Sequence, residues 1–154
     1  MTESASTRSE TRDRNRVFFA FIAILSLAGV VVSAISLQRH YARSATEFCD
    51  FSQRFSCDIV NRSEYSSIVG IPVASVGVVG YALLFILSAF RRLCAEPPNR
   101  LLGAAIAGLG FALYLTYIEA YKLETWCILC LISQAVIALI TLFAIAIKLR
   151  PAKD

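Results

Sequence analysis

The chain has 154 residues, of which 57% are hydrophobic and 17% are charged, and its mean hydropathy is +0.64. A soluble domain carries about 25% charged residues, so this composition excludes an ordinary soluble domain and indicates a membrane protein. The net charge of +4 is modest. No stripe of basic residues with interleaved aromatic side chains is present, which argues against nucleic acid as a partner.

A polar segment precedes the first of four long apolar runs. Residues 1–15 are rich in Ser, Thr, Arg and Glu, and we predict that they form a disordered tail. The uncharged run 17–37 would extend about 31 Å as a helix, which is a full hydrocarbon thickness. It is too long for a signal peptide and lacks a clear small-residue cleavage motif. We therefore interpret it as an uncleaved first span.

Three further runs have the length and composition of spans, so we predict an all-α integral membrane protein, a four-transmembrane-helix bundle. None of the runs shows the polar face that a helix of a soluble bundle would carry. A long loop, residues 38–67, separates the first two spans, and we expect it to cap the bundle. The predicted spans are residues 17–37, 68–90, 101–121 and 126–148, within a membrane domain of residues 16–150.

The basic residues predict the orientation of the bundle. They gather before the first span, between the second and third spans and after the fourth, whereas the third connection has only Lys122. The long first loop carries four arginines, accompanied by four acidic residues. By the positive-inside rule, both termini face the cytoplasm of a multi-pass inner or plasma membrane protein, and the first loop is extracytoplasmic.

This orientation separates the five cysteines. Cys49 and Cys57 lie in the outer loop. Cys127 and Cys130, in the stretch "WCILC", lie at the outer mouth of the fourth span. The odd cysteine, Cys94, faces the reducing cytosol, which explains why it has no partner.

Four cysteines on the oxidising side allow three interpretations. A zinc site is disfavoured because the spacing of Cys49 and Cys57 is wider than that of a zinc knuckle. Two inert disulfides in a structural tetraspan protein are the second interpretation. The third is a redox relay between the two pairs, in which each exchange is a thiolate attack on a disulfide.

The spacing of Cys127 and Cys130 favours the relay. Residues three apart on a helix have Cα atoms about 5 Å apart, which permits a disulfide. Such a bond closes a very small loop and adds little stability through chain entropy, so it is better explained as reversible. We predict that Thr125 caps the fourth span. Cys127 would then lie in the first turn, where the helix dipole favours a thiolate.

The loop pair requires a different backbone. The apolar residues of 48–59 recur at helical spacing, which predicts an amphipathic helix. Cys49 and Cys57 would be about 12 Å apart along one continuous helix, too far for a disulfide. We therefore expect a break near residues 52–53 and a segment whose conformation changes with redox state.

The arrangement of these cysteines resembles that of the vitamin K epoxide reductase (VKOR) family, in its bacterial type without a fused thioredoxin domain. The shared features are a spaced pair in a long first loop and a CxxC that opens the fourth span. They lie in "CDFSQRFSCDIVNRSEYSSIVGIPVASVGVVGYALLF" (49–85) and "WCILC" (126–130). The resemblance covers about residues 17–147.

The resemblance implies catalytic roles for four cysteines. Cys130 would face a quinone of the ubiquinone, menaquinone or vitamin K type, which accepts the electrons. Cys127 would exchange with the loop pair through Cys57. Cys49 would exchange with a separate extracytoplasmic thioredoxin-fold protein, so that the reaction generates disulfide bonds.

Four residues are expected at the quinone site: Cys130, Gln134, Tyr81 and Ser63. Ser63 matches a loop serine that orders this region in the family, or it is a turn residue or helix cap. Gln134 could hydrogen-bond a quinone carbonyl or a neighbouring helix. Glu119 lies near the same mouth and could relay a proton, although residues at such positions are more often simply interfacial. No metal is expected.

Two residues of this chain differ from those of the animal members of the family, and the differences concern epoxide reduction. Gln134 stands where they have a tyrosine, and Val73 where they have an asparagine, which puts epoxide reduction in doubt. Reduction of vitamin K epoxide or quinone in the ER membrane stays an alternative, and Asn61–Ser63 forms a compatible glycosylation sequon. The disulfide bond formation protein B family performs equivalent chemistry, but its CxxC lies in the first loop.

Overall fold

The structure is a computed structural model that describes residues 2–41, 55–90 and 98–149. Cys49, Cys94 and the predicted break at residues 52–53 lie outside the described residues.

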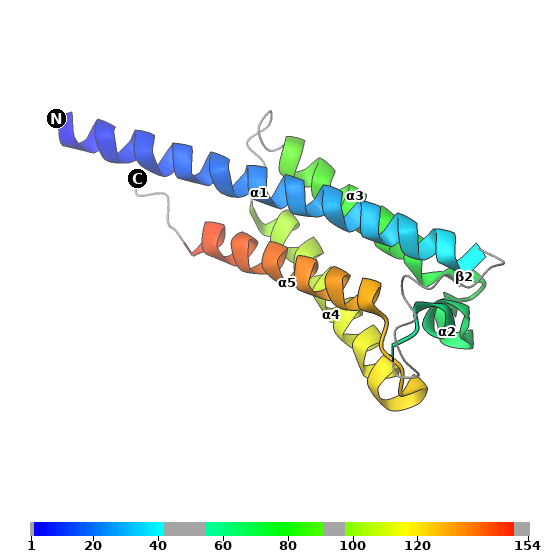
Figure 1. Cartoon of the computed structure of the whole chain (residues 1–154). Coiled ribbons are helices and arrows are strands. Elements are labelled where there is room, and N and C mark those ends of the chain that lie inside the picture. The colour runs from blue at the N-terminus through cyan, green and yellow to red at the C-terminus, as the bar shows by residue number, and fades with distance from the viewer. Residues whose placement is uncertain (1, 42–54, 91–97, 150–154) are drawn as a thin grey trace.

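Four helices in the described part of the chain are long and apolar enough to cross a membrane. They lie side by side as a bundle (Figure 1). The prediction of an all-α membrane bundle is therefore confirmed. The helices are α1 (Thr2–Tyr41), α3 (Val73–Phe90), α4 (Pro98–Ile118) and α5 (Ile128–Lys148).

The first helix is longer than the sequence predicts. Residues 1–15 were expected to form a disordered tail, but α1 begins at Thr2. The tail contains neither glycine nor proline, and extension of an existing helix costs far less than nucleation of a new one. The span can therefore continue as helix into the polar segment.

The second span is shorter than predicted. The sequence places its start at residue 68, whereas α3 begins at Val73. A short antiparallel hairpin precedes it, formed by β1 (Ser67–Ile68) and β2 (Ile71–Pro72). Val69 and Gly70 connect the strands with φ angles of 54° and 80°. Two positive φ angles are typical of a type I′ turn, and the apolar run conceals this turn signal.

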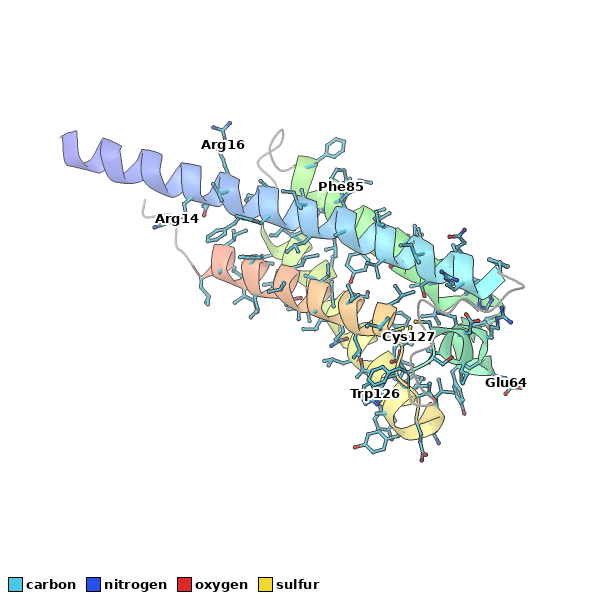
Figure 2. The ribbon with its side chains drawn as sticks, viewed as in Figure 1. Arg14, Arg16, Glu64, Phe85, Trp126 and Cys127 are labelled. Atoms are coloured by element: carbon cyan, nitrogen blue, oxygen red, sulfur yellow. The ribbon has the colours of Figure 1, made fainter. Side chains whose placement is uncertain are left out.

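A cap covers one end of the bundle. It consists of α2 (Cys57–Arg62), the 3-10 turn η1 (Glu64–Ser66) and the hairpin. Trp126, Cys127 and Glu64 lie at this end, whereas Arg14 and Arg16 lie towards the other (Figure 2).

The connection from α4 to α5 is irregular. After Ile118 the chain makes one π-helical turn, η2 (Glu119–Leu123), and then reverses at Glu124, whose φ is 49°. Helix α5 begins with Cys127 as its N-cap. The prediction that Thr125 caps this helix is therefore wrong, and Cys127 lies one position outside the first turn.

A close approach of α1 and α3 fixes the centre of the bundle. A Cβ atom at Gly29 would lie 2.4 Å from the ring of Tyr81, so only glycine leaves room for this side chain. Tyr81 belongs to the buried apolar cluster of the bundle, together with Ile22 and Ile140. Lipid is as apolar as the helix surfaces, so the hydrophobic effect does not drive helices together within a membrane. Small residues that permit close packing therefore become important.

We predict that Gly29→Ala destabilises the protein, because the added methyl group displaces the ring of Tyr81. Overpacking of this kind typically costs about 1–3 kcal/mol. Thermal unfolding in detergent would measure the loss. Gly103→Ala is the matched control, since a Cβ atom there meets nothing within 4 Å. Equal stabilities of the two variants would contradict this account of the helix pair.

Candidate functional site

Two free cysteines open α5. Cys127 is the N-cap of the helix and is completely buried, at 0% exposure. Cys130 lies one turn further and is partly buried. Both are reduced in this structure, and their side chains are hydrogen-bonded to each other. The CxxC is therefore a dithiol at the junction between the cap and the bundle.

The loop cysteine Cys57 lies against this pair. It is the first residue of α2, whose N-cap Ser56 accepts a hydrogen bond from the N–H of Ile59. Cys57 is disulfide-bonded, and its partner lies outside the described residues. It is also completely buried and shares an apolar cluster with Cys127. The structure thus brings together the two cysteines that the resemblance pairs for exchange.

A backbone bridge holds the two cysteine segments side by side. Phe55, two residues before Cys57, pairs in parallel with Trp126, directly before Cys127. This corrects the prediction of an amphipathic helix through residues 48–59. Phe55 lies in the bridge and pairs with Trp126. The helix begins only at Cys57, because Ser56 is its N-cap.

Three polar side chains anchor α2 to α1, and the sequence indicated only Asn61 among them, as part of a glycosylation sequon rather than as an anchor. The hydroxyl of Ser36 donates to Oδ1 of Asn61 at 2.7 Å. Nδ2 of Asn61 donates to the carbonyl of Cys57 at 2.9 Å. Nδ1 of His40 lies 2.5 Å from the carbonyl of Asn61; a carbonyl can only accept, so Nδ1 carries the proton. Asn61 therefore fixes the backbone that carries Cys57.

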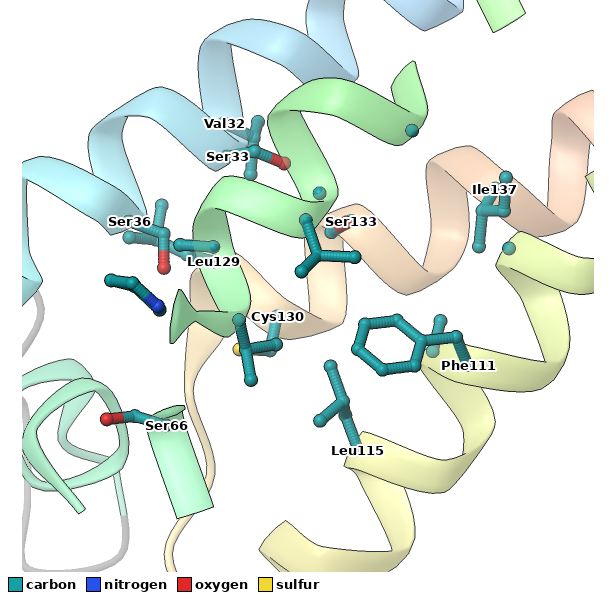
Figure 3. A pocket seen from close by; sticks show the side chains of 18 of the residues that line it. Val32, Ser33, Ser36, Ser66, Phe111, Leu115, Leu129, Cys130, Ser133 and Ile137 are labelled. Atoms are coloured by element: carbon teal, nitrogen blue, oxygen red, sulfur yellow. The ribbon is translucent and has the colours of Figure 1, made fainter. Parts of the chain in front are cut away.

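A cavity of about 390 Å³ lies inside the bundle below the cap. Its walls come from α1, α3, α4 and α5, and Figure 3 shows Leu115 and Phe111 of α4 at the same cavity as Cys130. Cys130, Tyr81 and Ser63, three of the residues expected at the quinone site, all line it. The lining is mainly apolar, with polar residues near the cap.

The hydroxyls of two of these residues already act as donors. Ser63 is the C-cap of α2, and its hydroxyl donates to the carbonyl of Val60 at 2.8 Å. The hydroxyl of Tyr81 donates to the carbonyl of Ser133 at 2.8 Å. Both interpretations of Ser63, as helix cap and as residue of the site, therefore fit the structure.

Gln134 meets a neighbouring helix, which is one of the two roles predicted for it. Gln134 does not line the cavity, and its Oε1 lies 3.5 Å from the hydroxyl of Thr116 on α4. A helix turns by about 100° per residue, so a stripe follows the spacing i, i+3, i+7. Ser133 and Ile137 continue this stripe from Cys130 and line the cavity. Simple helical periodicity could have indicated Ser133.

Glu119 is buried at the meeting point of the CxxC and the cavity. Its exposure is 3%, which contradicts the interpretation of a simply interfacial residue. Oε2 of Glu119 accepts a hydrogen bond from the backbone N–H of Cys127 at 3.2 Å. The side chain of Cys130 lies close enough to interact with the carboxylate, and both Glu119 and Cys130 line the cavity.

Because of its hydrogen bond with Cys130, the thiol of Cys127 is more acidic than its burial alone would allow. This bond lowers the pKa of Cys127 below the ordinary value, although burial of the sulfur acts in the opposite direction. A lowered pKa increases the thiolate fraction and makes Cys127 a better leaving group in disulfide exchange.

We predict that Asn61→Ala loosens the cap, because it leaves the hydroxyl of Ser36 and the carbonyl of Cys57 without this partner. Loss of such buried hydrogen bonds costs about 1–3 kcal/mol. A hydrophilic phosphine should then reduce the disulfide of Cys57 faster than in the wild type. The exposed Asn99 supplies the control, Asn99→Ala. An unchanged reduction rate would refute the anchoring role.

We predict that Cys130→Ala raises the pKa of Cys127, since the variant removes the hydrogen bond that stabilises the thiolate. The other three cysteines are replaced by alanine, so that only the CxxC titrates. Thiolate absorbance followed against pH should then appear at higher pH in the variant. A midpoint unchanged from that of the intact CxxC would contradict the assignment.

The family model for the vitamin K epoxide reductase family matches residues 20–145. A search of the curated proteins found no match. The family match covers most of the chain and includes Cys57 and the CxxC. The protein therefore belongs to the vitamin K epoxide reductase family, whose membership supports a general role as a membrane thiol–disulfide and quinone oxidoreductase.

Proposed function

We propose that the protein takes electrons from an extracytoplasmic thioredoxin-like protein and passes them to a membrane quinone, thereby generating disulfide bonds. One observation carries the proposal. Cys57 in the cap and Cys127 share a buried cluster, while Cys130 lines the cavity in the bundle. The cysteines thus form a continuous route from the cap to the lipid-embedded interior.

Burial supports the order of the exchange steps. Cys57 and Cys127 are both 0% exposed, so a protein in water cannot reach either sulfur. Electrons would therefore enter through Cys49, the other cysteine of the loop pair. The thiolate of the reduced partner attacks Cys49, the loop disulfide breaks, and Cys57 leaves with the electron pair.

The internal exchange then needs two further attacks. The Cys57 thiolate attacks the sulfur of Cys127, which breaks the Cys127–Cys130 disulfide and releases Cys130 with the electron pair. Cys49, freed when the partner's second thiol completes its own disulfide, then attacks Cys57 and releases Cys127. The lowered pKa of Cys127 favours this release, since acidic thiols leave faster. The loop disulfide is restored and the CxxC is reduced.

The cavity fits a quinone. Pockets for small molecules have volumes of about 300–1,000 Å³ and mainly apolar walls, and this cavity of about 390 Å³ agrees with both features. When bound, the quinone supplies the two-electron acceptor for the CxxC. Tyr81, Ser63 and Cys130 would hold it. Tyr81 and Ser63 already donate to backbone carbonyls, so their hydroxyl oxygens can accept from the hydroxyl groups of the quinol product, whereas a quinone carbonyl has no hydrogen to give them.

The charge distribution supports the predicted orientation. Arg14 and Arg16 lie towards one end of the bundle, and Cys127 lies at the other (Figure 2). Basic residues favour the cytoplasmic side. We therefore propose that the cap and the CxxC face the extracytoplasmic side of an inner or plasma membrane.

Epoxide reduction is less well supported than quinone reduction. Val73 begins α3 and lines the cavity. The animal relatives that reduce the epoxide have an asparagine at the corresponding position. An apolar side chain there cannot donate a hydrogen bond to an epoxide or carbonyl oxygen.

The proposal predicts which cysteines are needed for turnover. The purified protein is mixed with a reduced thioredoxin-fold protein and with ubiquinone or menaquinone, and quinone absorbance is followed. Cys130→Ala and Cys57→Ala should abolish quinone reduction, because each breaks the route. Cys94→Ala should retain it, since Cys94 stands outside both pairs and serves as the matched control.

Two outcomes would exclude this function. One is full turnover by Cys130→Ala, and the other is no turnover by the wild type with either quinone. A mixed disulfide between the loop and Cys127, trapped in Cys130→Ala, would identify the internal exchange step directly.

A further inference from the structure

A carboxylate is an unusual neighbour for a redox dithiol inside a membrane protein. Glu119 is 3% exposed and lies within the third apolar span. An acidic side chain in such a place is costly, and acidic residues kept there usually have a functional reason. Its two polar neighbours are both parts of the CxxC: the backbone N–H of Cys127 and the side chain of Cys130.

The local backbone is built around this carboxylate. Helix α4 widens into the π-turn η2 at Glu119 itself, and π-turns occur often at functional sites. The left-handed residue Glu124 then reverses the chain. The reversal returns the chain to Cys127, so that the carboxylate meets an N–H group eight residues later in the sequence.

We infer that Glu119 is a catalytic acid–base residue that exchanges a proton with the thiol of Cys130. The inference rests on the proposed function, because it assigns a role within the same dithiol–disulfide cycle. Glu119 touches a reacting atom and lines the cavity that would hold the acceptor. It therefore lies beside the sulfur that changes its protonation state.

The proton balance of the cycle requires such a group. When a thiolate attacks Cys127, the Cys127–Cys130 bond breaks and Cys130 leaves with the electron pair. The protonated carboxyl of Glu119 gives its proton to this sulfur, so the apolar site gains no additional charge. When the dithiol is oxidised again, two electrons pass to the quinone, and the carboxylate takes back the proton of Cys130, which leaves Glu119 protonated for the next reduction. The two protons that the quinol needs come from water, which took up those of the partner's thiols.

Other titratable groups lie near this path. Cys127 and Cys130 face Glu119 from the start of α5. Among the described residues, the cavity is also lined by His40 from α1, Tyr65 from the cap and Tyr81 from α3. None of these three interacts with Glu119 in the structure, whereas the side chain of Cys130 does.

A purely structural role is the alternative, because Glu119 also helps to cap α5. Glu119→Gln separates the two roles. The amide oxygen of glutamine can still accept from the N–H of Cys127, but the amide cannot carry the proton. Glu124→Gln is the matched control: it makes the same chemical change at an exposed residue of the same connection.

The test uses infrared difference spectra of protein in which the other three cysteines are alanine. Dithiothreitol reduces the CxxC and no quinone is added. On reduction, the C=O band of a protonated carboxyl should disappear in the wild type and in Glu124→Gln. The band change should be absent in Glu119→Gln and shifted in frequency in Glu119→Asp. No carboxyl band change in the wild type would overturn the proposal, whether or not any variant folds.

A rate measurement completes the test. Reduction of the CxxC by dithiothreitol, stopped by alkylation, should be about 100-fold slower in Glu119→Gln, because general acid–base catalysis contributes factors of about 10² or more. A wild-type rate in a folded Glu119→Gln protein would overturn the proposal. Since neither measurement contains quinone, failure here is distinct from failure of quinone reduction in the wild type.

Discussion

The contact between Cys57 and Cys127 is the interaction on which the rest of the site depends. Thiol–disulfide exchange proceeds only when one sulfur reaches another, so two cysteines far apart in the sequence must be held together. The cap holds Cys57 against Cys127. The Phe55–Trp126 bridge aligns the two segments, and Asn61 ties the carbonyl of Cys57 to α1.

Irregular backbone near a membrane has to satisfy its polar groups within the protein. The segment between η2 and α5 meets this requirement with side chains from distant places. The carboxylate of Glu119 accepts from the N–H of Cys127, and Phe55 supplies the backbone partner of Trp126. The same groups that terminate the helices thus position the reactive sulfurs. The contacts that stabilise this segment are therefore the same contacts that position Cys127.

Much of the fold could be predicted from the sequence, because membrane spans are encoded locally. Uncharged runs of sufficient length indicated all four spanning helices. The start of α5 was predicted less well. Thr125 has a capping side chain, but Cys127 is the N-cap, since the carboxylate that satisfies its N–H comes from eight residues upstream. A local pattern does not encode such a partner.

The candidate site was predicted in part for the same reason. Spacing identified the CxxC, and the resemblance identified the loop pair, of which only Cys57 is described. Gln134 does not line the cavity, because the cavity follows the stripe of Ser133 and Ile137. The polar anchor of Ser36, His40 and Asn61 joins α1 to α2. Its three residues lie at the end of the first span and in the following loop, and no pattern in the neighbouring sequence indicates that their side chains meet.

The turn formed by Val69 and Gly70 has a consequence for how the cap is held. Both residues adopt positive φ angles, which a β-branched residue such as valine strongly resists. A flexible linker would not retain such a conformation. The hairpin is instead a stiff connection between the cap and α3, and it therefore fixes where α2, which carries Cys57, lies relative to the end of the bundle.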